Sequence, residues 1–287
     1  MENVLEIKGL TKRYDGFTLD NVNLALPKGN IMGFIGENGA GKSTTIKLIL
    51  NVIHRDSGEV KVFGRDNIEY ENEIKENIGV VYDESNFPDT LNAGNINTIM
   101  KNIYKNWDQD AFDHYLKKFS LPRKKDIKSF SRGMKMKLAI ATALSHQAKL
   151  LILDEPTSGL DPIIRDEILD IFLDFIQDEE HSIFLSTHIT SDIEKIADYI
   201  AFIHQGKIVF VESKDVLLDT YGVLKCRTSE FDALDKTFVK GYRKNKFGVE
   251  ALVEKHKLKE QYTIDHASIE DIMLFTVRGR SIERIDN

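Results

Sequence analysis

The sequence predicts an α/β fold, with a mixed central sheet whose strands alternate with helices and a small α+β extension after it. Short apolar runs, typical of buried strands, recur between stretches of helical periodicity up to about residue 211. A glycine-rich segment separates one such run from a helix-like stretch. Beyond about residue 220 the pattern changes to strand candidates at 223–227, 237–242 and 247–253 and a helix at 269–275. We therefore expect a large domain at residues 1–219 and an extension at 220–287, which carries no recognisable chemical motif.

Composition limits the possible partners. The 287 residues carry a net charge of −7, which gives no general affinity for nucleic acid or anionic lipid. We interpret the basic stretch Lys240, Arg243, Lys244 and Lys246 as a solvated face. The single cysteine, Cys226, excludes an intrachain disulfide and fits a reducing compartment.

No stretch approaches the ~20 apolar residues that span a bilayer. The N-terminal residues Met1-Glu2-Asn3-Val4 lack the charged-then-apolar pattern of a signal peptide. We expect a cytoplasmic protein, or one that partners hold at a membrane.

The chain begins with an antiparallel β subdomain. Residues 4–14 and 17–26 alternate apolar with polar side chains around Asp15-Gly16, which predicts a hairpin. Tyr14 at its end is either an edge-strand aromatic or a ring on which adenine stacks. Residues 31–35 predict a strand, 43–50 a helix and 59–63 a short strand. Residues 78–82 predict a buried strand that ends at Asp83-Glu84.

The glycine-rich segment, residues 36–44, fits a phosphate-binding loop. It reads Gly36, Glu37, Asn38, Gly39, Ala40, Gly41, Lys42, Ser43 and Thr44, which matches G-x-x-x-x-G-K-[ST] between a strand and a helix. Glycines let successive backbone N–H groups turn toward an anion, and the next helix adds its positive end. We expect Lys42 to reach the β- and γ-phosphates of a nucleotide and the Ser43 hydroxyl to bind Mg²⁺.

A helical insertion follows, at about residues 86–146. Ile96, Ile99, Met100 and Ile103 lie on one face of a predicted helix, and a second amphipathic stretch ends near residue 119. Ser131 is placed to cap the next helix.

Two later strands end in polar residues. Residues 150–153 form an apolar run that ends in Asp154-Glu155, and residues 182–186 lead to Thr187-His188. The carboxyl ends of strands are where ligands bind in open α/β sheets. A helix at 191–198 and strands at 199–204 and 207–211 complete the domain.

Four signals occur in a fixed order along the chain: the phosphate loop, residues 130–134, residues 150–155 and His188. This order resembles that of the ATP-binding subunit of ABC transporters. The resemblance covers residues 4 to about 219. It is closest to the ATPases of ABC-2 exporters that handle drugs, antibiotics and peptides, including the bacitracin-resistance and acetoin-operon types. Its implied fold is the P-loop ABC ATPase, and its implied cofactors are ATP and Mg²⁺.

The resemblance implies a role for each matched residue. Tyr14 falls at the adenine-stacking position, and residues 36–44 are the Walker A loop. Residues 150–154 match Walker B, in which Asp154 holds Mg²⁺ through water. Glu155 would be the base that polarises the attacking water, and His188 the switch histidine at the γ-phosphate. Residues 158–161, Ser-Gly-Leu-Asp, occupy the D-loop, where the family more often has Ser-Ala-Leu-Asp.

The chain departs from the family pattern at two further places. The signature, usually Leu-Ser-Gly-Gly-Gln, reads Phe-Ser-Arg-Gly-Met, so that Ser131, Arg132 and Gly133 would act on the partner subunit's ATP. Arg132 either weakens close approach or adds a cation near the γ-phosphate. Asp83 stands where the family has a glutamine, and carboxylates also bind Mg²⁺, so Asp83 is a candidate metal ligand.

The resemblance also implies partners. Two ATPase subunits, as a homodimer or heterodimer, would face each other head to tail on separate transmembrane permease subunits at the inner face of the cell membrane. The segment at 87–104 is the family's contact with the permease, and no nucleic acid is expected. Two alternatives stay open at this point. One is a nucleotide-gated regulatory subunit in which Arg132 and Asp83 make hydrolysis negligible. The other is a soluble ABC ATPase of DNA repair, translation or iron–sulfur assembly.

Overall fold

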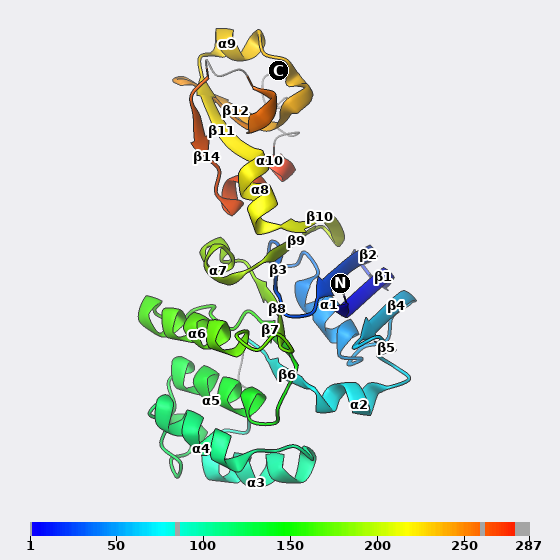
Figure 1. The fold of residues 1–287 in the computed structure, drawn as a ribbon, viewed down its shortest axis with the longest axis vertical. Helices are drawn as coiled ribbons and strands as arrows, with labels where there is room; N and C mark the ends of the chain where they lie inside the picture. Colours follow the sequence, from blue (N-terminus) through cyan, green and yellow to red (C-terminus); the bar gives the residue numbers. More distant parts are fainter. Residues whose placement is uncertain (1, 84–86, 259–261, 279–287) are drawn as a thin grey trace. The chain divides into compact units, whose positions relative to one another are not determined.

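The computed structural model describes residues 2–83, 87–258 and 262–278 (Figure 1). These described residues form two compact units, which divide after Val211. The first unit begins with the predicted hairpin, β1 (Asn3–Tyr14) and β2 (Phe17–Pro27). With β4 (Ser57–Val62) and β5 (Arg65–Asp66) it forms an antiparallel sheet of order β2-β1-β4-β5. The predicted N-terminal antiparallel subdomain is therefore confirmed.

The central sheet has the order β10-β9-β3-β8-β7-β6. Its strands are β3 (Ile31–Ile35), β6 (Ile78–Val81), β7 (Leu150–Asp154), β8 (Ser182–Thr187), β9 (Tyr199–His204) and β10 (Lys207–Ser213). The first five pair in parallel, and β10 turns back after Gln205-Gly206. Every residue of β3, β7 and β8 is buried, as expected for parallel strands covered on both faces. The sheet is mixed, as predicted.

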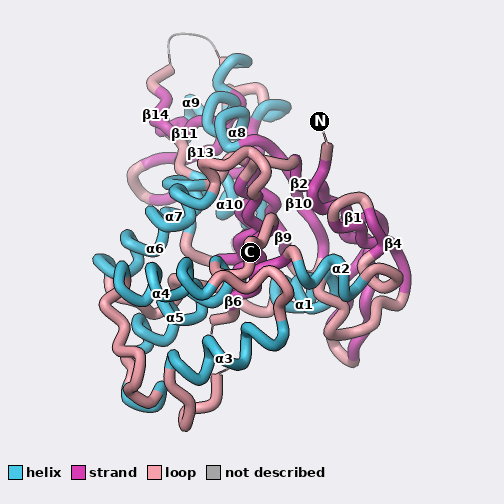
Figure 2. Tube along the Cα trace, turned by 60° about the horizontal axis from the view of Figure 1, so that its bottom comes forward, coloured by secondary structure: helices cyan, strands magenta, loops and turns pink. Residues whose placement is uncertain are grey.

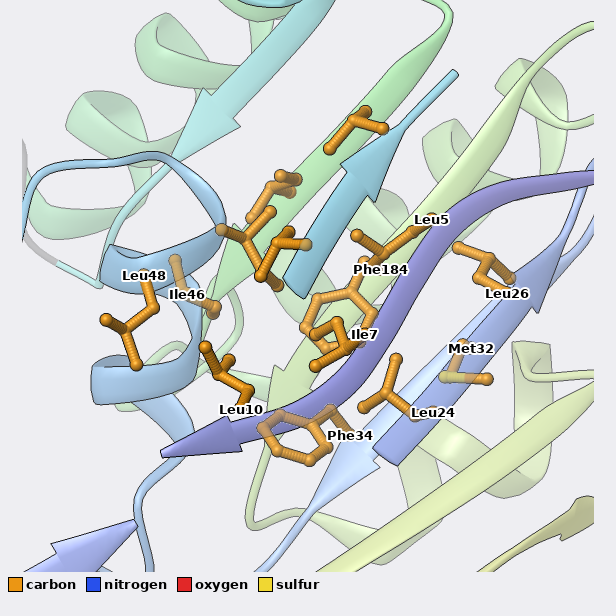
Figure 3. Packing of buried hydrophobic residues seen from close by; sticks show 14 of the residues in the cluster. Leu5, Ile7, Leu10, Leu24, Leu26, Met32, Phe34, Ile46, Leu48 and Phe184 are labelled. Carbon is orange, nitrogen blue, oxygen red and sulfur yellow. The ribbon is translucent and has the colours of Figure 1, made fainter. Parts of the chain in front are cut away.

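The main core lies between the antiparallel sheet, the central sheet and helix α1 (Lys42–Ile49). Figure 3 shows Leu5 and Ile7 of β1 near Phe34 of β3 and Phe184 of β8. Each such buried side chain stabilises the fold by about 2 kcal/mol relative to exposure. This packing fixes the end of β3 from which the phosphate loop leaves.

The helical insertion contains α3 (Ala93–Ile103), α4 (Gln109–Lys118), the short 3-10 helix Ile127–Ser129 and α5 (Arg132–Leu144). These helices lie together in both views, and α5 packs on β6 (Figures 1 and 2). The inserted helical subdomain is thus present. A small helix, α2 (Glu71–Glu76), precedes β6.

Two further helices flank the strands that carry the site. The sequence did not predict α6 (Pro162–Phe175), although Asp161 caps it and Pro162 occupies its first position. Helix α7 (Thr190–Ile196) ends two residues before the predicted end, because the Asp198 carboxylate accepts a hydrogen bond from Ile31 N at 2.8 Å instead. At 14 residues, α6 is the longest helix in the described part of the chain. No helix among the described residues is long and apolar enough to cross a membrane.

The second unit has its own sheet, of order β12-β13-β11-β14. Its strands are β11 (Tyr221–Cys226), β12 (Val239–Asn245), β13 (Gly248–Glu254) and β14 (Ile264–His266). Its helices are α8 (Lys214–Thr220), α9 (Thr228–Asp232), α10 (Ile269–Arg278) and the 3-10 turns Lys236–Phe238 and Lys255–Lys257. The predicted boundary after residue 219 falls inside α8. The chain divides after residue 211 because α8 packs on β11, and Lys255 Nζ donates to Leu218 O.

The basic stretch of β12 is largely neutralised by neighbouring acids. Lys240 pairs with Glu254 at 2.9 Å, Arg243 with Glu250 and Lys244 with Asp232. This pairing agrees with a solvated face.

Candidate functional site

The phosphate loop joins β3 to α1 in a conformation that depends on its glycines. Gly39 and Gly41 have φ of +81° and +115°, which side chains rarely adopt. A Cβ on Gly36 would lie 2.4 Å from Ile203 O of β9, so only glycine fits there. Gly206 N donates to Ala40 O at 3.0 Å and supports the loop from the β9–β10 turn. These contacts hold the loop in one curled shape.

Lys42 lies at the centre of this loop. Its side chain is 6% exposed, and Nζ donates to Gly36 O at 2.7 Å and to Glu37 O at 3.2 Å. The side chain of Ser43 is exposed at the first turn of α1, and Thr44 is half-buried. Glu37, Asn38 and Gly39 form the exposed part of the loop. The ammonium group is therefore fixed by the loop's own carbonyls.

The two carboxylates at the end of β7 have different environments. Asp154 is buried, and Ser186 Oγ of β8 donates to its Oδ1 at 2.5 Å. Glu155 N donates to Ser186 O at 3.0 Å, and φ of Glu155 is +52°. Because few non-glycine residues adopt this conformation, the surrounding packing must hold Glu155 in place.

Glu155 connects two other predicted site residues. Its Oε1 lies 3.2 Å from Lys42 Nζ, and its Oε2 lies 2.7 Å from His188 Nδ1 and 3.3 Å from His188 N. The Glu155 side chain is 14% exposed and that of His188 is 44% exposed. A carboxylate at this position can accept a proton from water while a cation and an imidazole orient it.

Oxygen ligands suitable for Mg²⁺ are present in this loop and strand. Mg²⁺ is usually held by one or two carboxylates together with substrate phosphates, and Asp154 with the Ser43 hydroxyl fits that set. Within the described ranges no three His, Cys, Asp or Glu side chains converge as a metal site of their own. Any Mg²⁺ bound here would therefore depend on the nucleotide for its other ligands.

Tyr82 and Asp83 follow β6 beside this region. Val81 of β6 pairs with Leu153 of β7, so Tyr82 and Asp154 lie at the ends of neighbouring strands. Burial, and then the negative charge of Asp154, raise the pKa of the Tyr82 hydroxyl. Asp83 is exposed and bonds to no other described residue. Glu84 lies outside the described residues. The metal role of Asp83 stays a prediction.

The signature segment, residues 131–133, begins α5. The Ser131 hydroxyl accepts a hydrogen bond from Met134 N at 3.2 Å, as predicted for a helix cap. Gly133 is buried, and a Cβ there would lie 2.8 Å from Ile164 of α6, so packing within the chain explains this glycine. Arg132 is exposed, and its Nη1 lies 2.8 Å from where a Cβ on Gly159 would be. The structure thus places Arg132 over the D-loop.

The hairpin ends in two aromatic residues, the predicted Tyr14 and Phe17, which the sequence did not single out. Tyr14 is 45% exposed at the end of β1, with Lys12 Nζ 5.7 Å from its ring centroid. Its strand partner Phe17 lies beside the phosphate loop, because a Cβ on Gly41 would meet Phe17 Cζ at 3.2 Å. The predicted hairpin places position 17 opposite Tyr14, and this pairing is the sequence signal that indicates Phe17. The adenine role of Tyr14 stays a prediction.

Comparisons with known proteins agree with this geometry. The family model for ABC transporters matches residues 19–158. Bacitracin transport ATP-binding protein BcrA of Bacillus licheniformis is 38% identical over 73% of this chain and 69% of that protein. Lantibiotic transport ATP-binding protein SrtF of Streptococcus pyogenes is 38% identical over 74% of this chain and 92% of that protein. A solved dimeric ATP-binding cassette with ADP and Pi has a TM-score of 0.66 at 21% identity, over 73% of this chain and 98% of that one, and so shares the fold. The chain belongs to the ABC transporter family, among its ATP-binding proteins.

Proposed function

We propose that this chain binds and hydrolyses ATP to power the export of a drug, antibiotic or peptide through separate transmembrane subunits. One observation supports hydrolysis most directly: Glu155 lies between Lys42 of the phosphate loop and His188, which follows β8. The export role is supported by the two relatives, which are named for bacitracin and lantibiotic transport.

Phosphoryl transfer needs charge neutralisation and an aligned water more than covalent chemistry. Lys42 and the backbone N–H groups of residues 36–44 would hold the β- and γ-phosphates. Glu155 would accept the proton of the attacking water, and His188 would contact the γ-phosphate. Mg²⁺ bound by Ser43 and Asp154 would neutralise phosphate charge. Tyr14, and Phe17 beside it, would border the adenine.

A second ATPase subunit would complete the site. The signature segment lies on α5, and the guanidinium of Arg132 makes no hydrogen bond or ion pair within the described chain. It therefore remains available to an anion from outside, which in this proposal is the ATP bound by the partner subunit. The solved cassette that shares this fold is a dimer, which agrees with a two-subunit state for this chain.

The helical insertion offers a place for the permease. A cavity of about 170 Å³ lies between β6, α3 and α5. Its lining is mainly apolar and aromatic and comprises Val80, Val81, Tyr82, Phe87, Met100, Tyr104, Ala139, Thr142, Ala143 and His146. An apolar side chain from a permease helix at the cytoplasmic face would dock in this cavity, and the ATPase would then be peripheral to the membrane.

The test is Mg²⁺-dependent ATP turnover by the purified chain, alone and with its co-purified membrane partner. Lys42→Ala should lower ATP affinity at least 100-fold in calorimetry, because the phosphates lose their fixed cation. Unchanged affinity would refute the phosphate-loop assignment. Turnover that is equally slow in wild type and Glu155→Gln, with the partner present, would instead support the nucleotide-gated regulatory subunit.

A further inference from the structure

A buried carboxylate in α7 has no assigned role. Asp192 is 0% exposed, and it accepts a hydrogen bond at 2.6 Å on Oδ2 from Thr157 Oγ1, which is 1% exposed. Its Oδ1 accepts from Arg165 Nε of α6. Arg165 also donates from Nη2 to Ser191 Oγ at 2.5 Å. A buried charge with every partner supplied by other segments indicates a contact that holds those segments together.

The partners of Asp192 lie on either side of the D-loop. Thr157 comes directly before residues 158–161, and Arg165 lies in the first turn of α6 directly after them. Asp161 caps α6 by accepting hydrogen bonds from Ile163 N and Ile164 N at 3.2 and 3.0 Å. One carboxylate therefore holds both ends of the D-loop.

The same carboxylate lies four residues after His188. The ends of β7 and β8 are joined by three successive side-chain contacts: Ser186 to Asp154, His188 to Glu155 and Asp192 to Thr157. Segments 154–157 and 186–192 are thus linked from the metal-binding position to the D-loop. A displacement of either segment would break a hydrogen bond to a buried charge, which is costly.

We propose that Asp192 is a positioning residue that couples the D-loop to the Glu155–His188 pair. The D-loop itself is accessible, because Gly159 and Asp161 are exposed. A partner subunit that moves the D-loop moves Thr157, and Asp192 transmits that motion to the His188 segment. The consequence for hydrolysis rests on the proposed ATPase function, whereas the mechanical coupling does not.

The test uses a matched pair of substitutions in the full chain. Thr157→Val removes the hydroxyl at nearly constant volume, and Thr157→Ser keeps it. Asp166→Asn is the control, because Asp166 also lies on α6 but forms an exposed pair with Lys195. If Thr157→Val fails to fold, Arg165→Lys is used instead. The Arg165 side chain is 26% exposed, and lysine keeps its positive charge while changing its hydrogen bonds to Asp192.

Two readouts separate coupling from general damage. We expect kcat of Thr157→Val to fall about tenfold, with KM and ATP affinity within twofold, while Thr157→Ser and the control keep kcat within twofold. Amide hydrogen exchange should become at least fivefold faster at residues 158–161 and 188–191 together in the valine variant alone. Unchanged kcat in Thr157→Val, equal losses in both Thr157 variants, or a parallel loss of ATP affinity would overturn the proposal. If the wild type turns over no ATP, the proposed function fails, and unchanged exchange at the two segments then overturns the coupling independently.

Discussion

Replacing Glu155 by glutamine tests the centre of the site. The substitution keeps the shape of the side chain but removes the negative charge between Lys42 and His188. A positioned general base typically contributes 10²- to 10⁴-fold to a rate. We therefore expect kcat to fall by roughly that factor, which corresponds to about 3–5 kcal/mol in the activation barrier.

The same substitution should strengthen ATP binding. At the 3.2 Å Nζ–Oε1 distance, the gross attraction of Lys42 and Glu155 is about 5 kcal/mol at an effective dielectric constant of ~20. Desolvation of both groups offsets most of it, which leaves a net value of about 1 kcal/mol. The phosphates of ATP compete with Glu155 for this ammonium and are repelled by the carboxylate. Glutamine removes both effects, so we expect about fivefold tighter binding.

Calorimetry and steady-state hydrolysis measure the two effects separately. Glu167→Gln is the matched control, because the Glu167 side chain is 53% exposed and pairs with Lys137 away from the site. This control should leave kcat and ATP affinity within twofold of wild type. Size-exclusion chromatography with Mg²⁺-ATP should show Glu155→Gln accumulating as a dimer. A variant that hydrolyses within threefold of wild type, or that binds ATP more weakly, would refute this account of Glu155.

Three other predictions follow from the surroundings of the site. Asp83→Gln should lower the Mg²⁺ concentration for half-maximal turnover, because a glutamine oxygen can bind the metal without adding an exposed negative charge beside the triphosphate. An unchanged or higher requirement would show that the charge of Asp83 does not act there. Gly159→Ala should lower the free energy of unfolding by about 1–2 kcal/mol, because φ of Gly159 is +67° and Arg132 fills the space that the new methyl group needs. This loss of stability, measured by thermal unfolding, should be smaller when Arg132 is also replaced by glycine. Equal losses with and without Arg132 would contradict the contact. Burial lowers the pKa of His146 from its ordinary value of 6.5, so the unfolded chain takes up the proton first and stability falls as pH drops below 6.5. Melting at pH 7.5 and 5.5 should therefore show a smaller acid-induced loss in His146→Phe, and an equal loss would exclude His146 as a contributor.

The sequence predicted what is local in the chain. The phosphate loop, Asp154-Glu155 and His188 each follow an apolar strand directly, so their place at the carboxyl end of the sheet follows from their neighbours. Helix α6 was missed although Asp161-Pro162 is a helix-start signal. The D-loop motif ends at Asp161, so it gives no indication of the helix that begins at Pro162.

What the sequence could not predict depends on tertiary contact. Asp192 and Thr157 are 35 residues apart, and neither belongs to a motif. Their pairing exists only because β7 and β8 are neighbours in the sheet. The hairpin pattern pairs Phe17 with Tyr14, but the contact of Phe17 with Gly41 depends on the packing of two sheets around α1. The division of the chain after residue 211 also depends on tertiary contact, because α8 packs on β11 of the second unit.

The two departures from the family motif at Arg132 and Gly159 are one structural feature. The family pattern has glycine in the signature and more often alanine in the D-loop, whereas this chain has arginine and glycine. The guanidinium of Arg132 occupies the space that an alanine methyl at position 159 would need. A cation in the first turn of α5 also opposes the helix dipole, so Arg132 does not stabilise its own helix. Its side chain lies over Gly159 of the D-loop, whose two ends Asp192 holds. The D-loop therefore contacts Arg132, whose charge would face the partner subunit's ATP, and is linked through Asp192 to the segment that carries His188. A change at residue 159 should alter both the position of Arg132 and the geometry of Glu155 and His188.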